Sequence, residues 1–407
     1  MRIYANLFLI LFVADGGFSL VDELVSLLTP LMPFSDLRNL LAITVIVMSV
    51  PIYLSLGIDR RLPKRVFLPL ILFVLWSLVS TSLFPILAKF QLYCLVMAAM
   101  QVAIGMLPLA CFRRGSECCL TIPPTQYGGS FFSRNNTLAF CAVNVFIVPI
   151  ILLLAAFTVA NAYMAEYTAG FMRLAPAGLT MTERTYTRGD RTIRLAAMIH
   201  VGDKEYYDTM ADSVTPGQTI VLAEGVSDNK HLLRSSIDYG EVAGSLGLVS
   251  QEKLLFRGAL IDEDEFEAPC LPTSGTGGKG ALAATDILRS DVDISDLQQA
   301  TIIFLNAVGE HLHKESSFVT GALALNDWAE KNITPDMNEI IMNDILHRRN
   351  LTVLRHLDTG LKRYDTIIIP WGALHMKEIE ADVLKRGFVL QKERERISID
   401  FRKMVMI

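Results

Sequence analysis

The chain has 407 residues, of which 52% are hydrophobic and only 19% are charged. This composition is too apolar for one ordinary soluble domain, so the chain must contain regions of different character. Residues 1–170 hold 10 basic and 7 acidic side chains, whereas residues 171–407 hold 27 and 35. The net negative charge therefore belongs to the second part, and we expect no nucleic-acid partner.

Apolar stretches about 18–25 residues long recur in the first part, and a helix of this length crosses a bilayer core about 30 Å thick. The predicted spans are 3–21, 39–56, 66–88, 92–112 and 139–162. Asp15, Gly16 and Gly17 interrupt the first span, so we expect Asp15 at the membrane interface. Alternatively, this stretch is a signal peptide, with Arg2 ahead of an apolar core over Ile3–Ala14.

Positive charge beside the spans predicts their orientation, because Lys and Arg are retained on the cytoplasmic side. The loops after the second and fourth spans carry most of it, as Arg60, Arg61, Lys64, Arg65, Arg113, Arg114 and Arg134. Only Lys89 lies in the loop between the third and fourth spans. We therefore expect an integral protein of the plasma (inner) membrane, in contact with the lipid bilayer, with its C-terminal part on the outer face.

The outer part begins with a strand pattern. The pattern changes near Leu174, and residues 179–203 predict a hairpin whose turn is Arg188-Gly189-Asp190 and whose second strand is Ile193–Ile199. Asp203 can cap a helix over Lys204–Val214, and Thr219–Ala223 is a further apolar strand. Strand, helix and strand in this order predict a βαβ unit with a parallel sheet.

Helices and loops fill most of the remaining chain. The predicted helices are Lys230–Gly244, Leu297–Lys314, Ser317–Lys331, Pro335–Arg348 and Leu351–Arg363, with a mobile surface loop over 262–280. Thr366–Ile369 is a strand, a helix ends at Gly387, and residues 388–401 predict a closing pair of strands. The expected architecture is an N-terminal α-helical transmembrane bundle over 1–165 plus a C-terminal α/β domain over 174–407, with a mixed, largely parallel sheet and flanking helices.

Three strand ends carry side chains suited to metal chemistry. His200 and His375 follow apolar strands, and Glu224 ends the strand "TIVLAE". The carboxyl ends of parallel strands are where α/β proteins bind ligands. Two imidazoles and a carboxylate can hold a divalent ion of the Mn, Co or Zn class with a position left for water. The alternative is that each histidine is a hydrogen-bonded residue of the core or surface.

The motifs "AAMIHVGD", "VLAEGVSD", "GLVSQ", "HRRN" and "PWGALHMKEIEADVLKRGF" occur in this order. Together they resemble the TraB/PrgY/Tiki (GumN-like) superfamily over His200–Phe388, and the membrane part takes no share in the resemblance. Its late Gly-x-x-His motif is intact as Gly372-Ala373-Leu374-His375. The early motif departs from the family, because Ala197 occupies the usual glycine position ahead of His200.

The resemblance implies roles for five residues. His200 and His375 would be metal ligands or acid/base groups, and Glu224 a ligand or the general base on the attacking water. Arg349 would neutralise an oxyanion and Asn350 would orient a ligand or the substrate. Without the resemblance, Arg349 could equally be a cation at a helix C-terminus.

Tiki members of this superfamily are described as metal-dependent proteases outside the cell, and PrgY members as membrane proteins that inhibit a secreted peptide. We therefore expect a membrane-anchored, metal-dependent hydrolase acting on an extracytoplasmic peptide or acyl substrate. The alternative is a non-catalytic binding or signalling module that sequesters a secreted peptide or another small molecule.

Two further groups are weaker candidates. Glu310 with His313, or His311 with Glu315, could share a ligand on one helix face, although a solvated face is the simpler interpretation. Asp291 and Asp293 could line the crevice at the strand ends, or could serve as loop or helix-capping residues.

Overall fold

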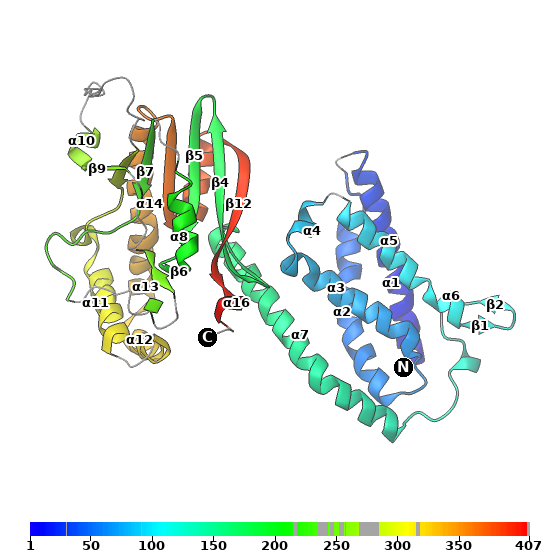
Figure 1. The fold of residues 1–407 in the computed structure, drawn as a ribbon. Coiled ribbons are helices and arrows are strands. Elements are labelled where there is room, and N and C mark those ends of the chain that lie inside the picture. The colour runs from blue at the N-terminus through cyan, green and yellow to red at the C-terminus, as the bar shows by residue number, and fades with distance from the viewer. Residues whose placement is uncertain are drawn as a thin grey trace. The chain divides into compact units, whose positions relative to one another are not determined.

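The computed structural model divides the chain into two compact units, Met1–Ala160 and Asn161–Ile407 (Figure 1). It describes residues 1–29, 31–90, 92–214, 218–234, 243–244, 248–251, 256, 258–267, 285–314 and 318–404. The division falls a few residues before the expected domain boundary, inside the last long helix of the first unit. Each unit has its own hydrophobic core.

The first unit is mainly helical, with one short antiparallel strand pair, β1 (Arg113–Arg114) and β2 (Glu117–Cys118). The helices are α1 (Arg2–Ser26), α2 (Ser35–Ile58), α3 (Lys64–Leu83), α4 (Ile86–Lys89), α5 (Tyr93–Gly105), α6 (Leu107–Cys111) and α7 (Arg134–Thr168). Five helical stretches are long and apolar enough to cross a membrane, with α5 and α6 together forming the fourth. The sequence prediction of five such helices is thus confirmed. Insertion in a membrane and its orientation remain predictions.

Helix α1 corrects the expectation of a break beside Asp15. The helix continues through Asp15, Gly16 and Gly17 without a break, and Asp15 is buried. Its Oδ2 accepts a hydrogen bond of 2.7 Å from Gln101 Nε2 on α5. A Cβ on Gly16 would lie 3.0 Å from Gln101 Cγ, so the glycine permits the two helices to pack closely. Gly16 therefore serves helix packing, and neither glycine breaks the helix.

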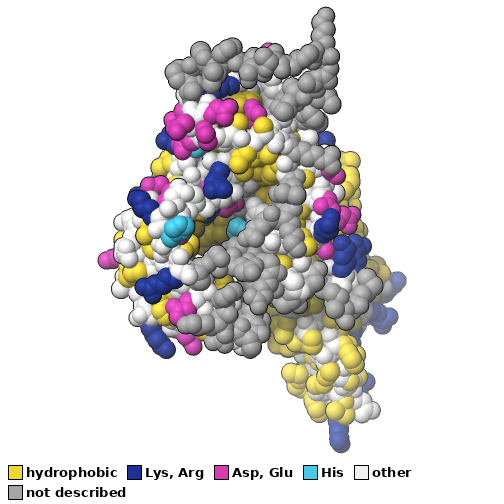
Figure 2. All heavy atoms as spheres, turned by 60° about the vertical axis from the view of Figure 1, so that its left-hand side comes forward, with side chains coloured by type: hydrophobic (Ala, Val, Ile, Leu, Met, Phe, Trp, Pro, Cys, Tyr) yellow, Lys and Arg dark blue, Asp and Glu magenta, His cyan; other side chains and the backbone are white. Residues whose placement is uncertain are grey.

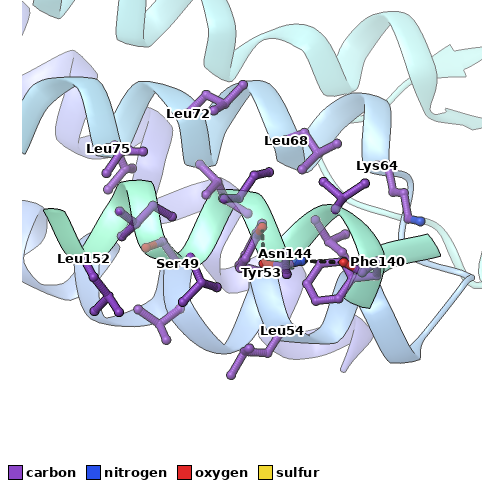
Figure 3. A pocket seen from close by; sticks show the side chains of 18 of the residues that line it. Ser49, Tyr53, Leu54, Lys64, Leu68, Leu72, Leu75, Phe140, Asn144 and Leu152 are labelled. Carbon is purple, nitrogen blue, oxygen red and sulfur yellow. Dashed lines mark hydrogen bonds between the residues drawn. The ribbon is translucent and has the colours of Figure 1, made fainter. Parts of the chain in front are cut away.

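An apolar groove of about 670 Å³ lies between α2, α3 and α7. Figure 3 shows leucine side chains from these helices lining it, with Lys64 at one end. The polar groups inside are already paired, because Tyr53 donates a 2.8 Å hydrogen bond to Asn144 Oδ1 and Asn144 donates to the Phe140 carbonyl oxygen. The groove offers an apolar surface but no reactive group.

The second unit is built on an eight-stranded sheet with the order β12-β4-β5-β11-β7-β10-β9, with β3 beside β4. The strands are β3 (Met172–Ala175), β4 (Gly178–Arg188), β5 (Arg191–Met198), β7 (Thr219–Ala223), β9 (Ala259–Ile261), β10 (Asp286–Arg289), β11 (Thr366–Gly372) and β12 (Val389–Asp400). Strands β5, β11, β7, β10 and β9 run parallel, whereas β3, β4 and β12 pair antiparallel. The predicted mixed, largely parallel sheet is confirmed.

The predicted hairpin is also confirmed, since β4 and β5 pair across a turn in which Gly189 has φ +57°. The prediction of a closing pair of strands over 388–401 was wrong. Residues Val389–Asp400 form the single strand β12, which pairs along β4 with two irregularities in register. Because β4 is nearly as long, at 11 residues against 12, it offers a partner for almost the whole segment, and no second turn is needed.

The helices of this unit include α8 (Lys204–Ala211), α11 (Gln299–Lys314), α12 (Phe318–Asn332), α13 (Pro335–Met342), α14 (Arg349–Gly360) and α15 (Met376–Lys385). Asp203 occupies the N-cap position of α8, but its side chain does not cap that helix. Instead its Oδ2 accepts a hydrogen bond from the Asp400 backbone N–H, which ties the end of β12 to this turn.

The two helices predicted over 335–363 form one continuous helical stretch. Between α13 and α14, residues Asn343–Arg348 form a π-helical segment, a rare conformation that is common near functional sites. It allows the buried Asp344 to accept hydrogen bonds from Gln298 N and Thr301 Oγ1 at the start of α11. Arg349 and Asn350 follow directly.

Two other predicted segments are only partly described. Residues 230–234 of the predicted helix Lys230–Gly244 are not helical, and most of the remainder lies outside the described residues. Within the predicted loop 262–280, Glu263–Glu267 form the short helix α10, and residues 268–280 lie outside the described part. The buried Phe266 explains the helix, because its packing into the core orders this turn.

Candidate active site

Three neighbouring parallel strands end at a common edge of the sheet. Glu224 directly follows β7, Asp291 follows β10 by two residues, and the Gly372–His375 motif ends β11 and begins α15. Arg349 and Asn350, at the start of α14, reach the same place. The face shown in Figure 2 is hollowed near its centre, with histidine side chains at the edge of the hollow.

His375 is held in one orientation and one tautomer. Its buried ring lies with Nδ1 2.8 Å from Asn350 Oδ1. The Asn350 amide donates in turn from Nδ2 to Glu378 Oε2 at 2.6 Å, so its oxygen must face the imidazole as an acceptor. The proton therefore lies on Nδ1. The lone pair on Nε2 faces Glu224, whose Oε1 is 3.7 Å away.

Burial lowers the pKa of His375 to about 4. Desolvation of the charged ring is the main cause; Glu224 opposes it, and Arg349 adds to it. The charge of His200 also lowers the pKa of His375, by less than any of these groups. The ring is thus neutral at physiological pH, which is the form that accepts a proton or binds a metal.

Arg349 lies between the two acidic side chains. Its Nε and Nη2 donate to Asp291 at 2.9 and 2.6 Å, and Nη2 also donates to Glu224 Oε1 at 2.8 Å. Burial alone lowers the pKa of Arg349, but the hydrogen bonds and charges of Asp291 and Glu224 outweigh burial and raise it. The remaining nitrogen, Nη1, lies 3.4 Å from His375 Nε2. One donor of a fixed guanidinium therefore faces the imidazole.

Asp291 and Asp293 have different roles: the first lies at the strand ends, and the second caps a helix. Asp291 belongs to the site, with a fully buried side chain that also accepts from the Gly225 backbone N–H. Asp293 caps the short 3-10 helix at Ile294–Asp296 and accepts from Ser227 Oγ. Backbone hydrogen bonds from Asn229 and Ser295 lower the pKa of Asp293. The signal for Asp291 was an acidic residue just beyond an apolar strand, as at Glu224.

His200 is placed differently from His375. It is exposed on the bend between β5 and β6 (Val201–Gly202), where its carbonyl accepts from the Gln251 N–H. Ala197, at the usual glycine position, lies inside β5 in register with Trp371 of β11. Its carbonyl accepts from the Tyr206 hydroxyl at 2.6 Å. An ordinary strand residue thus fits there without distortion.

Gly372 acts through its backbone. Its N–H donates to Glu224 Oε2 at 2.6 Å, which fixes the second oxygen of that carboxylate. A Cβ at this position would lie 3.5 Å from both Glu224 Oε2 and His375 Cδ2, an ordinary contact distance. The close backbone approach expected here therefore does not depend on glycine.

The arrangement matches part of what a metal ion requires. Neutral imidazole and carboxylate are suitable donors, and Glu224 and Asp291 exceed Arg349 by one negative charge. However, Arg349 Nη1 and Nη2 lie against His375 and Glu224, so an ion there requires the guanidinium to retreat toward Asp291. Among the described residues, three potential ligands with atoms within 4.8 Å of one another occur elsewhere. They are Glu263, Glu267 and His356, and none of them belongs to this site.

The weaker helix candidates gain no support. His311 lies with its ring centroid 6.3 Å from that of Trp328, a packing contact between α11 and α12. The side chains of His313 and Glu315 lie outside the described residues. Sequence reasoning also missed Glu378, which positions Asn350, and Trp371, whose ring packs edge-on against His375 at 5.0 Å.

Comparison of the chain with protein-family models, with curated proteins and with solved structures finds no match. The resemblance to the TraB/PrgY/Tiki superfamily thus rests on the quoted motifs and stays a prediction.

Proposed function

We propose that the α/β unit is a hydrolase whose centre is His375, Glu224 and Arg349, acting on a peptide or acyl substrate. The observation that supports this most directly is the neutral imidazole with its Nε2 lone pair beside a buried carboxylate and a guanidinium N–H. A base, a group that stabilises its protonated form and an oxyanion donor are the parts that acyl transfer to water needs.

His375 Nε2 is the proton acceptor in this proposal. It takes a proton from a water molecule that attacks the substrate carbonyl, and it later returns the proton to the leaving group. Glu224, 3.7 Å from Nε2, stabilises the imidazolium that forms. Both oxygens of Glu224 already accept hydrogen bonds, from Arg349 and from Gly372 N–H, so His375 suits the role of base better.

Arg349 is the proposed oxyanion donor. Asp291 fixes two of its nitrogens, so Nη1 is held facing the imidazole and needs no reorganisation during the reaction. Asn350 and Glu378 form the second layer that keeps His375 in its reactive tautomer. Asn350 is therefore a positioning residue for the imidazole.

A divalent ion of the Mn, Co or Zn class bound by His200, Glu224 and His375 is the metal-dependent form of the proposal, in which Nε2 of His375 would be a ligand and not the proton acceptor. The donor types and the excess negative charge support it. When bound, the ion would lower the pKa of its water toward neutrality. Membrane anchoring through the first unit, with the α/β unit on the outer face, suits an extracytoplasmic substrate.

The proposal is tested with the full chain in lipid nanodiscs and a panel of peptide and acyl-ester substrates. His375→Gln should lower the rate about 10²- to 10⁴-fold. His311→Gln, a matched change on α11, should leave the rate unchanged. Chelation of metal before the assay separates metal-dependent from metal-independent hydrolysis. Equal rates for His375→Gln and the unaltered chain would exclude this centre.

A second candidate function has one observation in its favour. Arg349 is paired with two carboxylates, so the centre is largely satisfied without a substrate. A binding or signalling module that sequesters a secreted peptide or small ligand requires no more than that. Stoichiometric capture of a peptide that is recovered uncleaved, with no turnover on any substrate, would favour this function.

A further inference from the structure

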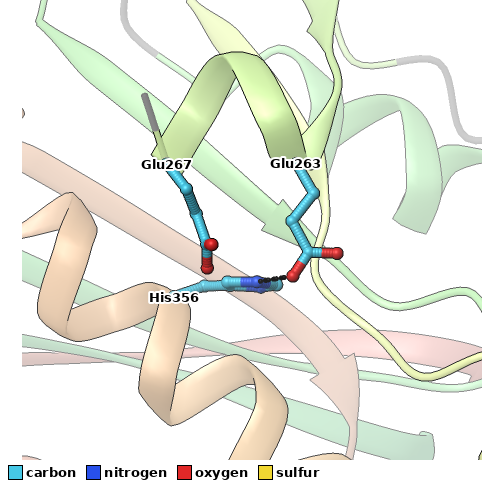
Figure 4. Close-up of side chains that lie close together, drawn as sticks. All are labelled: Glu263, Glu267 and His356. Atoms are coloured by element: carbon cyan, nitrogen blue, oxygen red, sulfur yellow. Dashed lines mark hydrogen bonds and ion pairs between the residues drawn. The ribbon is translucent and has the colours of Figure 1, made fainter. Parts of the chain in front are cut away.

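We propose that Glu263, Glu267 and His356 form a second metal site, for a first-row transition-metal dication such as Zn²⁺. Helix α10 presents the two glutamates one turn apart, and α14 contributes the histidine. Figure 4 shows both carboxylates directed from α10 toward the imidazole ring. One ligand atom from each residue lies within 4.8 Å of the other two.

The imidazole of His356 is built as a ligand. It is buried, and its Nδ1 lies 2.7 Å from Ser290 Oγ, also buried. A ligating histidine typically donates its other ring N–H to such a partner, which fixes the ring and the tautomer. Without a metal, the Ser290 hydroxyl can donate to Nδ1 while Nε2–H donates to Glu263 Oε1, 3.1 Å away. A bound metal would replace the proton on Nε2, and Nδ1–H would then donate to Ser290 Oγ.

Arg355 places a positive charge beside Glu263 and His356. Its Nη2 lies 2.5 Å from Glu263 Oε1 and 3.3 Å from His356 Nε2. The side chain is 60% exposed, and solvent screening makes an exposed ion pair of this kind weak. A dication can therefore displace it. The position occupied by the guanidinium marks where positive charge is favourable.

The donor set selects the class of ion. One imidazole and two carboxylates suit zinc, manganese or cobalt, whereas calcium and magnesium prefer oxygen ligands alone. Ligand atoms around zinc lie about 2.0–2.2 Å from the ion, so the group must contract. The two exposed glutamates on one helical turn can close on the buried, fixed imidazole.

The site would brace the elements that hold the proposed catalytic centre. Arg349 and His356 lie two turns apart on α14. Ser290, the partner of His356, directly precedes Asp291, which holds Arg349. A metal that joins α10 to His356 would therefore stabilise α14 and the end of β10 together. Its role would be structural, and it does not require the proposed hydrolase activity.

The test is a Zn²⁺ titration of the full chain in nanodiscs after chelator treatment, with calorimetry and thermal unfolding as readouts. Glu263→Gln and Glu267→Gln should each weaken zinc binding at one site about tenfold or more. They should also remove the zinc-dependent rise in the unfolding temperature of the unaltered chain. Glu265→Gln, on the same helix and also exposed, should bind zinc as the unaltered chain does.

His375→Gln in the same titration identifies any ion held at Glu224, because it leaves the α10 site intact. Both glutamates of the proposed site are exposed, so their substitution does not endanger folding. The proposal is overturned if the unaltered chain binds no zinc, or if the two glutamate variants bind it with unchanged affinity and stoichiometry.

Discussion

Two buried histidines of the α/β unit have nearly the same immediate neighbours. His375 Nδ1 faces Asn350 Oδ1, and its Nε2 faces a glutamate and an arginine, Glu224 and Arg349. His356 Nδ1 faces a serine hydroxyl, and its Nε2 faces a glutamate and an arginine in the same manner. The local chemistry is shared, so the difference in proposed role must come from the surroundings.

The surroundings differ in exposure. The side chains of Glu224 and Arg349 are 6% and 13% exposed, whereas those of Glu263 and Arg355 are 52% and 60% exposed. In addition, Asp291 anchors Arg349, and among the described residues no second carboxylate is recorded with Arg355. A fixed, desolvated set suits stabilisation of a developing charge. An open set with a replaceable cation suits metal binding.

The largest expected effect separates the two arginines. Arg349→Met leaves Glu224 and Asp291 buried without their cation, and should lower the free energy of unfolding by about 3–5 kcal/mol. Arg355→Met should change it by less than about 1 kcal/mol, because its ion pair is exposed. Urea unfolding of the α/β unit within the full chain measures both. Equal losses would show that the two settings do not differ as described.

The pH dependence of stability tests the first histidine. The pKa of His375 is about 4 in the folded protein and about 6.5 when unfolded, so the unfolded chain binds more protons between these values. Stability should therefore be lost as pH falls from about 6.5 to about 4, by on the order of 3 kcal/mol. His375→Gln should flatten this part of the profile in urea unfolding. An unchanged slope would contradict the buried neutral ring.

The partners of the two Nδ1 atoms provide a paired test. Asn350→Leu leaves the Nδ1–H of His375 without an acceptor and should cost about 1–3 kcal/mol of stability. It should also reduce hydrolysis while zinc affinity stays the same, and Asn350→Asp, which keeps an acceptor, should restore part of the rate. Ser290→Ala should instead weaken zinc binding. If Asn350→Leu and Ser290→Ala both change hydrolysis, or both change zinc affinity, the two histidines do not have the separate roles proposed.

The smallest effect is expected at Gly372. The methyl group of Gly372→Ala meets Glu224 Oε2 and His375 Cδ2 at 3.5 Å, and the backbone N–H that binds Glu224 is retained. Stability and hydrolysis should change by no more than about 1 kcal/mol and a few-fold. A loss as large as that of His375→Gln would mean that the site requires closer backbone approach than this geometry shows.

The sequence alone determined the features that depend on local pattern. Long apolar runs predicted five membrane-length helices, and strand periodicity predicted the hairpin, the parallel strands β5, β7 and β11, and the strand ends that carry Glu224 and His375, but not β9 or β10. Hydrophobic periodicity reports which elements form because each element must bury one face. The errors at Gly16-Gly17 and at 388–401 arose because packing against a distant partner, α5 in the first case and β4 in the second, decided the structure.

Only the tertiary structure decided which charges meet. Arg349 reaches Asp291 across 58 residues and Glu224 across 125, and no local pattern specifies such pairs. The same is true of Glu263, Glu267 and His356, which no spacing motif connects. The degree of burial decided the different properties of the two sites. Burial lowers the pKa of His375, whereas Glu263 is open to solvent. Exposure is a property of the folded surface, so it cannot be obtained from a residue's neighbours along the chain.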